Sequence, residues 1–403
     1  MTSERTHQAD SRQDLRITIP YQYSVFFTRN VFAGGNRCFA DGCLEIADGG
    51  PLRCLFFVDA GVVRAHPGIL ERIGAYCERH GDVLSPAAAP SVLPGGETCK
   101  NSLDGVGRVI EAARRSRLCR HSLIAAVGGG AVLDVVGFAA SLVHRGIRLI
   151  RVPTTVLSQN DSGVGVKNGV NWCGSKNFLG TFAPPVAVFN DADFLPTLHD
   201  RDWRSGISEA VKVALIRDAD FLEWLLGRMA ALRRRDRPAM ETLVRRCARL
   251  HLSHIGETGD PFEFGSARPL DFGHWAAHQL ESMTDHALTH GEAVSVGMVL
   301  DLFYAADLGW ISQEDALRVR QGLEAAGLPT WHSALEWTGR DGRVRLFDGI
   351  EAFREHLGGE LHVTLPCPVG RKREVTALDR KRLRRCIEQM KQGSFEGKQP
   401  ECG

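Results

Sequence analysis

Short, continuous runs of apolar residues recur through the first half of the chain. Each run is rich in Val, Ile, Leu, Ala or Phe, and segments with apolar residues at helical spacing separate the runs. Strands that are apolar on both faces and alternate with helices are typical of a parallel sheet covered on both sides. The first half therefore predicts an α/β domain, with strands near residues 54–59, 122–127, 148–153 and 186–190.

The pattern changes near residue 201. Long amphipathic segments follow at residues 207–216, 239–254 and 291–308, and their apolar positions follow the period of a helix. One short strand is expected at residues 360–366. The second half therefore predicts an all-α domain.

These patterns set the expected domain boundaries. We place the α/β domain at residues 19–198 and the α-helical domain at residues 199–388. The polar ends, residues 1–18 and 389–403, are predicted to be a disordered N-terminus and a flexible tail.

The composition is that of an ordinary globular protein. The 403 residues carry a formal net charge of +1, with 43% hydrophobic and 24% charged residues, so nothing indicates a nucleic-acid partner. No apolar run approaches the ~20 residues of a membrane helix, and the polar beginning of the chain lacks the apolar core of a signal peptide. We therefore expect a cytoplasmic protein without a membrane partner. The 11 cysteines are odd in number and form no Cys-x-x-Cys pair, which indicates reduced thiols.

Three glycines, at residues 128–130, stand where a predicted strand ends and a helical segment begins. At such a junction the backbone can approach a phosphate closely, and the helix N-terminus offers free N–H groups. Asp59, at the end of another predicted strand, could accept hydrogen bonds from a ribose, and Glu97 and Lys100 add an acid and a cation. The glycines could also form an ordinary tight turn. The pattern favours a nucleotide site, although the Gly-x-Gly-x-x-Gly fingerprint is absent.

Residues 151–182 are rich in glycine, hydroxyl and amide side chains, and include Lys167 and Lys176. Few bulky apolar side chains interrupt them. The composition predicts a loop that wraps a polar, anionic ligand, with a solvated loop as the alternative.

Three histidines and an aspartate follow in the helical half. His274 and His278 are four residues apart, so both rings project from one face of a helix, and His290 lies beyond the next turn, with Asp271 nearby. Such a cluster is typical of a metal site. A solvated helix face or a pair of buried core histidines would give the same spacing.

The motifs resemble, in order and spacing, 3-dehydroquinate synthase and its sugar phosphate cyclase relatives, over roughly residues 50–370. The resemblance implies a dinucleotide-binding α/β domain followed by an α-helical metal-binding domain, with the active site in the cleft between them. The matched motifs are Gly128-Gly-Gly130 with Asp134, Pro153-Thr-Thr155, Ser158-Gln-Asn-Asp161, Gly165-Val-Lys167, Lys176-Asn177, Glu209-Ala-Val-Lys212, Gly273-His274 with His278, and His290-Gly-Glu292.

The resemblance also implies roles for single residues. Glu209, His274 and His290 would bind one divalent metal, zinc or cobalt. Lys212 and Asp161 would act near the reacting carbons, and the substrate phosphate would contact His278, Lys167, Asn177 and, across the interface of a homodimer, Arg145. The residues expected to bind NAD are Asp59, Glu97, Lys100, Gly129, Gly130, Asp134, Thr154, Thr155, Lys176 and Thr197.

The implied reaction is a phosphate-eliminating cyclisation. A seven-carbon sugar phosphate is oxidised, loses phosphate, is reduced again, and closes a carbocycle by an intramolecular aldol step. The metal would polarise the reacting oxygens, and the net redox change is zero.

The sequence departs from dehydroquinate-forming members where they bind the substrate carboxylate. A lysine position is His251, an asparagine position is Asp271, and an arginine position is Ala267, although Arg268 stands beside it. Fewer cations and one more anion disfavour a carboxylate, because an unpaired buried charge is costly. The segment Arg-Pro-Leu-Asp-Phe-Gly-His at residues 268–274 resembles that of sedoheptulose 7-phosphate cyclases of the 2-epi-5-epi-valiolone synthase kind, and we expect sedoheptulose 7-phosphate as substrate.

Three alternatives stay open at this stage. Residues 158–161 and 176–180 are closer to 3-dehydroquinate synthase proper. A metal-dependent polyol dehydrogenase and a non-catalytic sugar-phosphate-binding protein are less favoured, because the phosphate and metal residues are all present. Late in the chain, Arg354 or His356 would replace a lysine contact to phosphate.

Overall fold

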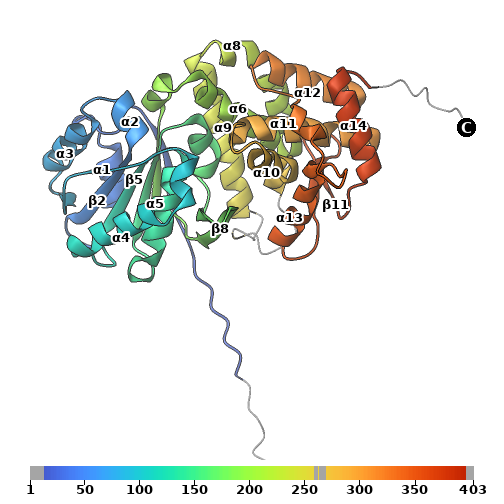
Figure 1. Cartoon of the computed structure of the whole chain (residues 1–403). Helices are drawn as coiled ribbons and strands as arrows, with labels where there is room; N and C mark the ends of the chain where they lie inside the picture. Colours follow the sequence, from blue (N-terminus) through green and yellow to red (C-terminus); the bar gives the residue numbers. More distant parts are fainter. Residues whose placement is uncertain (1–12, 258–261, 263–268, 396–403) are drawn as a thin grey trace, which may run out of the picture.

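The structure is a computed structural model that describes residues 13–257, 262 and 269–395. Figure 1 shows a part built on a β-sheet, from blue to green, beside a helical part, from yellow to red. Both predicted classes of domain are confirmed.

The first part contains a parallel sheet. Its strands run in the order β1-β9-β6-β5-β2-β3, β4 also pairs with β2, and each of these pairs is parallel. The predicted strands correspond to β2, β5, β6 and β9. The strand bounds are β1 (Ser24–Thr28), β2 (Leu52–Asp59), β3 (Leu84–Pro86), β4 (Ser91–Leu93), β5 (Leu123–Gly128), β6 (Arg148–Pro153) and β9 (Ala187–Asp191).

Helices cover both faces of this sheet, and β2 shows why. Successive side chains of a strand point to opposite faces. Cys54, Phe56 and Val58 pack on the face covered by α1 and α3, whereas Leu55 and Phe57 pack on the face covered by α4 and α5. For this reason both sets of side chains in β2 are apolar, and the strand is a continuous apolar run in the sequence. The helices are α1 (Cys38–Leu44), α2 (Ala60–Ala65), α3 (Ile69–Arg79), α4 (Asp104–Arg115) and α5 (Gly130–Leu142), with the short helices η1 (Glu97–Asn101) and η2 (Val143–Arg145).

The second part packs around α11 (His290–Asp307), in which Gly291 and every residue from Ala293 to Ala306 are buried. Helices α6, α10, α12 and α14 pack against it (Figure 1). The three predicted segments lie in α6, α9 and α11. The other helices are α6 (Asp200–Arg217), α7 (Ala219–Leu226), α8 (Met229–Arg233), α9 (Arg237–Glu257), α10 (His274–Met283), α12 (Gln313–Ala325), α13 (Asp348–His356) and α14 (Arg380–Gln392), with η3 (Ser158–Ser162), η4 (Ala192–Thr197), η5 (Pro269–Asp271), η6 (Ser333–Glu336) and η7 (Arg345–Phe347) among the short ones.

The prediction of a loop over residues 151–182 is wrong for its second half. Residues 167–182 form an antiparallel hairpin of β7 (Lys167–Trp172) and β8 (Ser175–Phe182). Cys173 and Gly174 close it with φ of 47° and 81°, the pattern of a two-residue hairpin turn. A Cβ on Gly180 would lie 2.8 Å from the carbonyl oxygen of Asn168, so the glycine that suggested a loop lets the two strands approach.

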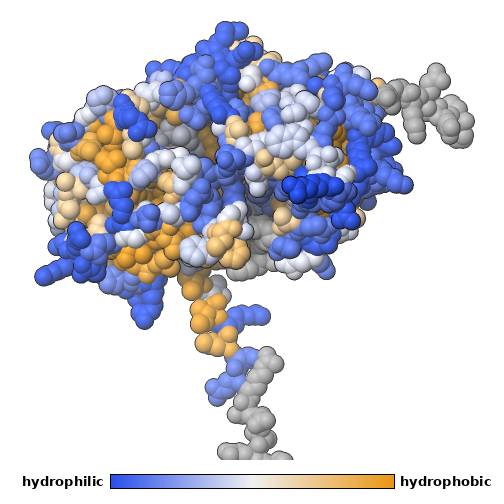
Figure 2. Space-filling model, in the orientation of Figure 1, coloured by the Kyte–Doolittle hydropathy of each residue, from blue (hydrophilic) through white to orange (hydrophobic). Residues whose placement is uncertain are grey.

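The ends of the domains also differ from the expectation. Helix α14 continues to Gln392, with Gln389 and Met390 buried, so residues 389–392 are not a flexible tail. Residues 13–23 contain no helix or strand, and Figure 2 shows this extended segment leaving the body with apolar residues along it. Residues 1–12 and 396–403 of the predicted ends lie outside the described residues.

Three smaller expectations can be compared with the structure. The late strand exists as β10 (Val363–Pro366), paired with β11 (Lys372–Val375). The ten cysteines in the described part of the chain are free thiols, as expected. Within the same residues, no helix combines the length and apolar character that a bilayer span requires.

Candidate functional site

The predicted cofactor residues lie along one edge of the sheet. Asp59 ends β2, Gly129 follows β5, and Thr154 and Thr155 follow β6. These three strands are neighbours and parallel, so their carboxyl ends meet at the same edge, where α/β sheets bind ligands. Thr197 ends the short helix that follows β9, the next strand in the sheet.

Glycine is needed at this edge because the backbone is crowded there. Gly129 caps α5, and a Cβ on Gly130 would lie 2.7 Å from Oγ of Ser162. A Cβ on Gly95 would lie 2.1 Å from Oδ1 of Asp59, a carboxylate that accepts a hydrogen bond from the N–H of Gly61 at 2.6 Å. The first residues of α5 are half-buried, so its N-terminus can offer N–H groups to an anion such as a phosphate.

Lys100 is a buried cation in this region. Its Nζ donates to Oδ2 of Asp134 at 2.6 Å and to Oδ1 of Asn177 at 2.5 Å, and Oε1 of Glu97 is 4.0 Å away. Burial alone would lower the pKa of Lys100, but Asp134 and Glu97 raise it. The ammonium therefore stays charged and ties η1 to α5 and β8.

A second cluster lies in the helical part, where Glu209 of α6 meets His274 of α10 and His290 of α11. Oε1 of Glu209 is 3.8 Å from Nε2 of His274 and 3.4 Å from Nε2 of His290, and one ligand atom from each of the three lies within 4.8 Å of the others. Glu209 is fully buried, and its Oε1 has no hydrogen-bond partner within the described residues. A buried acceptor that faces two imidazoles favours a cation between them.

Local structure fixes both histidines. Each is the first residue of its helix: Gly273 precedes His274 with φ of 78°, and Thr289 precedes His290 in a capping box with Glu292. A Cβ on Gly273 would lie 2.8 Å from the backbone nitrogen of Met298. These motifs therefore set the ring positions through backbone geometry.

The Nδ1 atoms of the two histidines, on the side of each ring away from Glu209, have hydrogen-bond acceptors. Nδ1 of His274 lies 3.1 Å from the carbonyl oxygen of Phe272, and Nδ1 of His290 lies 3.2 Å from Oε1 of Glu281. Because carbonyls and carboxylates accept, each Nδ1 carries a proton, and Nε2 of His274 can offer a lone pair to a metal. Burial would lower the pKa of His290, but Glu281 and Glu209 raise it to about 9, so a metal would displace a proton from its Nε2. Burial lowers the pKa of His274 well below its usual range, so that ring is neutral. Two imidazoles and a carboxylate suit zinc or cobalt and leave open positions for a substrate.

A buried lysine and an ion pair adjoin the cluster. Lys212 stands one helical turn after Glu209 and contacts its carboxylate; burial would lower the pKa of Lys212, but Glu209 and Asp161 raise it. Asp161 lies in η3, and its Oδ1 is 2.9 Å from Nε2 of His251 on α9. Burial would lower the pKa of His251, yet Asp161 raises it to about 10. Negative and positive side chains therefore alternate beside the candidate metal ligands.

Comparison with known families identifies the family of the chain. The model of the 3-dehydroquinate synthase N-terminal domain matches residues 90–205, and that of its C-terminal domain matches residues 206–341. The chain belongs to the 3-dehydroquinate synthase family.

Several solved structures share the fold over nearly the whole chain. ValA, a 2-epi-5-epi-valiolone synthase from Streptomyces hygroscopicus subsp. jinggangensis 5008 with NAD+ and Zn2+ bound, is 28% identical, with a TM-score of 0.83; the match covers 94% of this chain and 99% of that one. A 2-deoxy-scyllo-inosose synthase complexed with carbaglucose-6-phosphate, NAD+ and Co2+ is 24% identical and covers 92% and 96%, with a TM-score of 0.69. A probable glycerol dehydrogenase from Sinorhizobium meliloti 1021, 16% identical, covers 91% and 96% with a TM-score of 0.58, and so shows only a shared fold.

Other predicted residues of this dehydroquinate synthase-like chain lie at varied distances from the cluster. The ring of His278 is edge-on to His274, with centroids 5.3 Å apart, and lies 6.1 Å from His290, so the three histidines do gather. Lys167 begins β7, and Asn177 lies in β8 beside Lys100. Arg145 follows α5, at the amino end of β6 and therefore at the opposite edge of the sheet.

The positions proposed for substrate specificity are only partly described. Asp271 ends η5, three residues before His274. Arg354 lies on α13, where it pairs with Glu351 at 2.8 Å. Arg268 and the side chain of His356 lie outside what the structure describes.

The sequence analysis missed two buried acids. Glu281 on α10 contacts both His290 and Lys176. Asp301 on α11 accepts hydrogen bonds from the N–H of Gly273 at 3.0 Å and from Nε1 of Trp275 at 2.9 Å, on either side of His274. A signal existed for each: Glu281 is two helical turns after His274, and Asp301 is the one charged residue in the apolar run 293–306.

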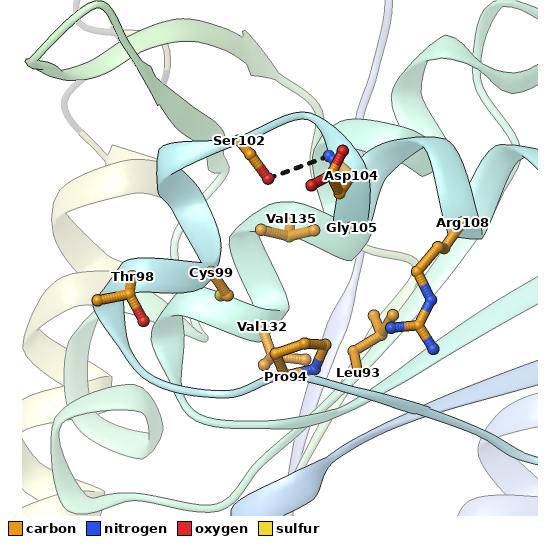
Figure 3. Close-up of a pocket in the computed structure, with 10 residues that line it drawn as sticks. All are labelled: Leu93, Pro94, Thr98, Cys99, Ser102, Asp104, Gly105, Arg108, Val132 and Val135. Atoms are coloured by element: carbon orange, nitrogen blue, oxygen red, sulfur yellow. Dashed lines mark hydrogen bonds between the residues drawn. The ribbon is translucent and has the colours of Figure 1, made fainter.

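A separate cavity of about 220 Å³ lies beside the predicted cofactor segment. Figure 3 shows it between the 93–108 segment and α5. Its volume is below the roughly 300 Å³ at which ligand pockets begin, so it is small for a dinucleotide. Its lining residues are Leu93, Pro94, Thr98, Cys99, Ser102, Asp104, Gly105, Arg108, Val132 and Val135.

Proposed function

We propose that this chain is an NAD- and divalent-metal-dependent sugar phosphate cyclase, a lyase that converts sedoheptulose 7-phosphate into a carbocyclic cyclitol and releases phosphate. The observation that carries the proposal is the buried cluster of Glu209, His274 and His290 beside the charged Lys212. It occurs in a chain whose strand ends carry residues that we expect to bind NAD. NAD would supply a reversible hydride acceptor, and zinc or cobalt would supply a Lewis acid.

The chain's own residues provide the remaining chemistry. Lys212 is held as an ammonium next to Glu209, so it can donate a hydrogen bond to a substrate oxygen held at the cluster as negative charge develops there. Asp161 is an acceptor near this position. The phosphate group would be bound, before and during its elimination, by Lys167, Asn177 and His278.

The choice of sugar rests on His251. Its Nε2 faces Asp161 at 2.9 Å and its Nδ1 faces the carbonyl oxygen of Cys247 at 3.1 Å. Asp161 therefore compensates the positive charge of His251, and Nδ1 has an acceptor within the protein. Asp271 adds a further carboxylate close enough to raise the pKa of Lys212. A pocket of this kind favours hydroxyl groups over a carboxylate.

The likeness to the 2-epi-5-epi-valiolone synthase supports this choice, whereas the family models carry the name of 3-dehydroquinate synthase, which is the second candidate. Purified protein with NAD and zinc or cobalt should release phosphate from sedoheptulose 7-phosphate without accumulating NADH. Turnover of only the carboxylated substrate of 3-dehydroquinate synthase would overturn the choice in favour of that enzyme. Net NADH formation would indicate a dehydrogenase.

A homodimer is part of the proposal. Helix α5 carries the chain from Gly130 at the cofactor edge to Leu142, a length of about 20 Å at 1.5 Å per residue. Arg145 is exposed beyond that end of the helix. Its predicted role at a substrate phosphate would therefore be exerted in the site of a second copy.

A further inference from the structure

Glu281 is a buried carboxylate between the two candidate sites. It lies on α10 with an exposed fraction of 2%. Its two oxygens are each 2.9 Å from Nζ of Lys176, a residue of β8 in the α/β part. Its Oε1 is also 3.2 Å from Nδ1 of His290 in the helical part. One side chain thus contacts a predicted cofactor residue and a metal-ligand candidate.

A second metal ion is one possible role for this arrangement, because ligand atoms of His278, Glu281 and His290 also lie within 4.8 Å of one another. The ammonium of Lys176 argues against it, since it already bonds to both oxygens of Glu281. A dication in the same place would face that positive charge at short range. Glu281 is therefore better suited to orient its neighbours than to bind a metal.

The orientation of His290 depends on both of its ring nitrogens. Nδ1 donates to Glu281, and Nε2 faces Oε1 of Glu209 at 3.4 Å. A carboxylate behind a ligating imidazole fixes the ring and its tautomer and strengthens the metal bond. Loss of Glu281 would leave the imidazole ring of His290 free to rotate and to change its tautomer.

Lys176 connects the same carboxylate to the cofactor edge. Its Nζ is 4.0 Å from Oε1 of Glu97, an acid of η1 that is predicted to contact NAD. The ammonium therefore stands between an acid of each part of the molecule. A ligand that fixes Lys176 and Glu97 also fixes the position of Glu281.

We propose that Glu281 is a positioning residue that couples the two sites, so that NAD and the metal ion each strengthen the binding of the other. The proposal rests on the proposed function, because it needs a chain that binds both. Coupling between two ligands is reciprocal, so the same factor should be found from either direction.

The test measures zinc affinity by competition with a chromophoric chelator, without NAD and with saturating NAD, and NAD affinity without and with zinc. The wild-type protein should bind zinc more tightly with NAD present. Glu281→Gln keeps one acceptor oxygen for His290 but loses the charge that holds Lys176, and Glu281→Ala loses both. We expect zinc affinity to fall by roughly 10- to 100-fold, more for Ala than for Gln, and the effect of NAD on zinc affinity to disappear.

Two further variants keep the test specific. Lys176→Met should retain most of the zinc affinity measured without NAD but lose the coupling. Glu223→Gln removes a carboxylate from an exposed ion pair with Arg318 and should change neither quantity. Thermal unfolding of each metal-free variant separates a local effect from loss of the fold.

The outcomes distinguish the inference from the function on which it rests. A wild-type protein that binds neither zinc nor NAD would overturn the proposed function. A wild-type protein that binds both, with variants at Glu281 and Lys176 that keep its affinities and its coupling factor, would overturn only the inference. Weaker zinc binding with an unchanged coupling factor would likewise overturn it.

Discussion

The indole of Trp275 donates a hydrogen bond to the carboxylate of Asp301 at 2.9 Å inside the core of the helical part. The two residues are 1% and 0% exposed. The same carboxylate accepts the N–H of Gly273, so Asp301 holds the backbone before His274 and the indole side chain after it. A metal-ligand candidate is thereby fixed by a residue of another helix.

Replacing Asp301 should therefore affect both stability and metal binding. Asp301→Ala leaves the indole and the Gly273 N–H without an acceptor, at a cost of roughly 1–3 kcal/mol for each buried donor. Zinc affinity should fall together with the free energy of unfolding. Chemical denaturation and chelator competition measure the two quantities, and an unchanged unfolding midpoint would contradict the prediction.

The same carboxylate should make stability depend on pH. Burial raises the pKa of Asp301 from 3.8 to about 7, so between these values the folded state binds the proton more tightly than the unfolded chain. Its stabilising contribution is fully present below about pH 4 and is lost as the pH rises through 7. Asp301→Asn, which cannot titrate, should not lose stability in this window relative to its own value at pH 4. Parallel slopes for the two proteins in thermal unfolding would refute this.

Removal of a ligand should abolish metal binding. His274→Ala deletes one of two imidazoles, and zinc affinity should fall by more than the roughly 100-fold that loss of an outer partner can cause. Chelator competition measures it, and turnover should vanish in the same variant. Retained zinc affinity would show that the metal lies elsewhere.

A role for Arg145 in a second copy can be tested by complementation. Arg145→Ala and Lys212→Ala should each be inactive as homodimers. If Arg145 acts across the interface, mixed dimers contain one intact site, and mixing the two variants after subunit exchange should restore part of the turnover. Sedimentation must show a dimer, and mixtures that stay inactive despite exchange would place Arg145 in its own site or in none.

Substrate choice should respond to the charges near Lys212. The double variant His251→Lys, Asp271→Asn replaces the cation paired with Asp161 by a longer, more flexible one and removes an anion. Relative to wild type, we expect kcat/KM for sedoheptulose 7-phosphate to fall by roughly tenfold, about 1.4 kcal/mol in the barrier, and the carboxylated substrate to gain. Phosphate release with each sugar measures the ratio. An unchanged ratio would exclude these residues as determinants of specificity.

The sequence by itself determined the features that depend on neighbouring residues. The apolar runs predicted β2, β5, β6 and β9, since a strand covered on both faces must be apolar throughout. The glycines after β5 and the motif at His290 carry their own turn and capping geometry, so the spacing of the motifs was enough to indicate the family and the metal-ligand candidates.

Only the tertiary structure decided the contacts between residues that are distant in the chain. Lys176 and Glu281 are 105 residues apart, and Trp275 and Asp301 are 26 apart. Glu281 and Asp301 are both visible in the sequence. Their partners are not, because only the packing of the folded chain brings those partners into contact. The hairpin of β7 and β8 was missed for a related reason: its stability comes from pairing across the strands and packing on α5, which the polar composition of either strand does not reveal.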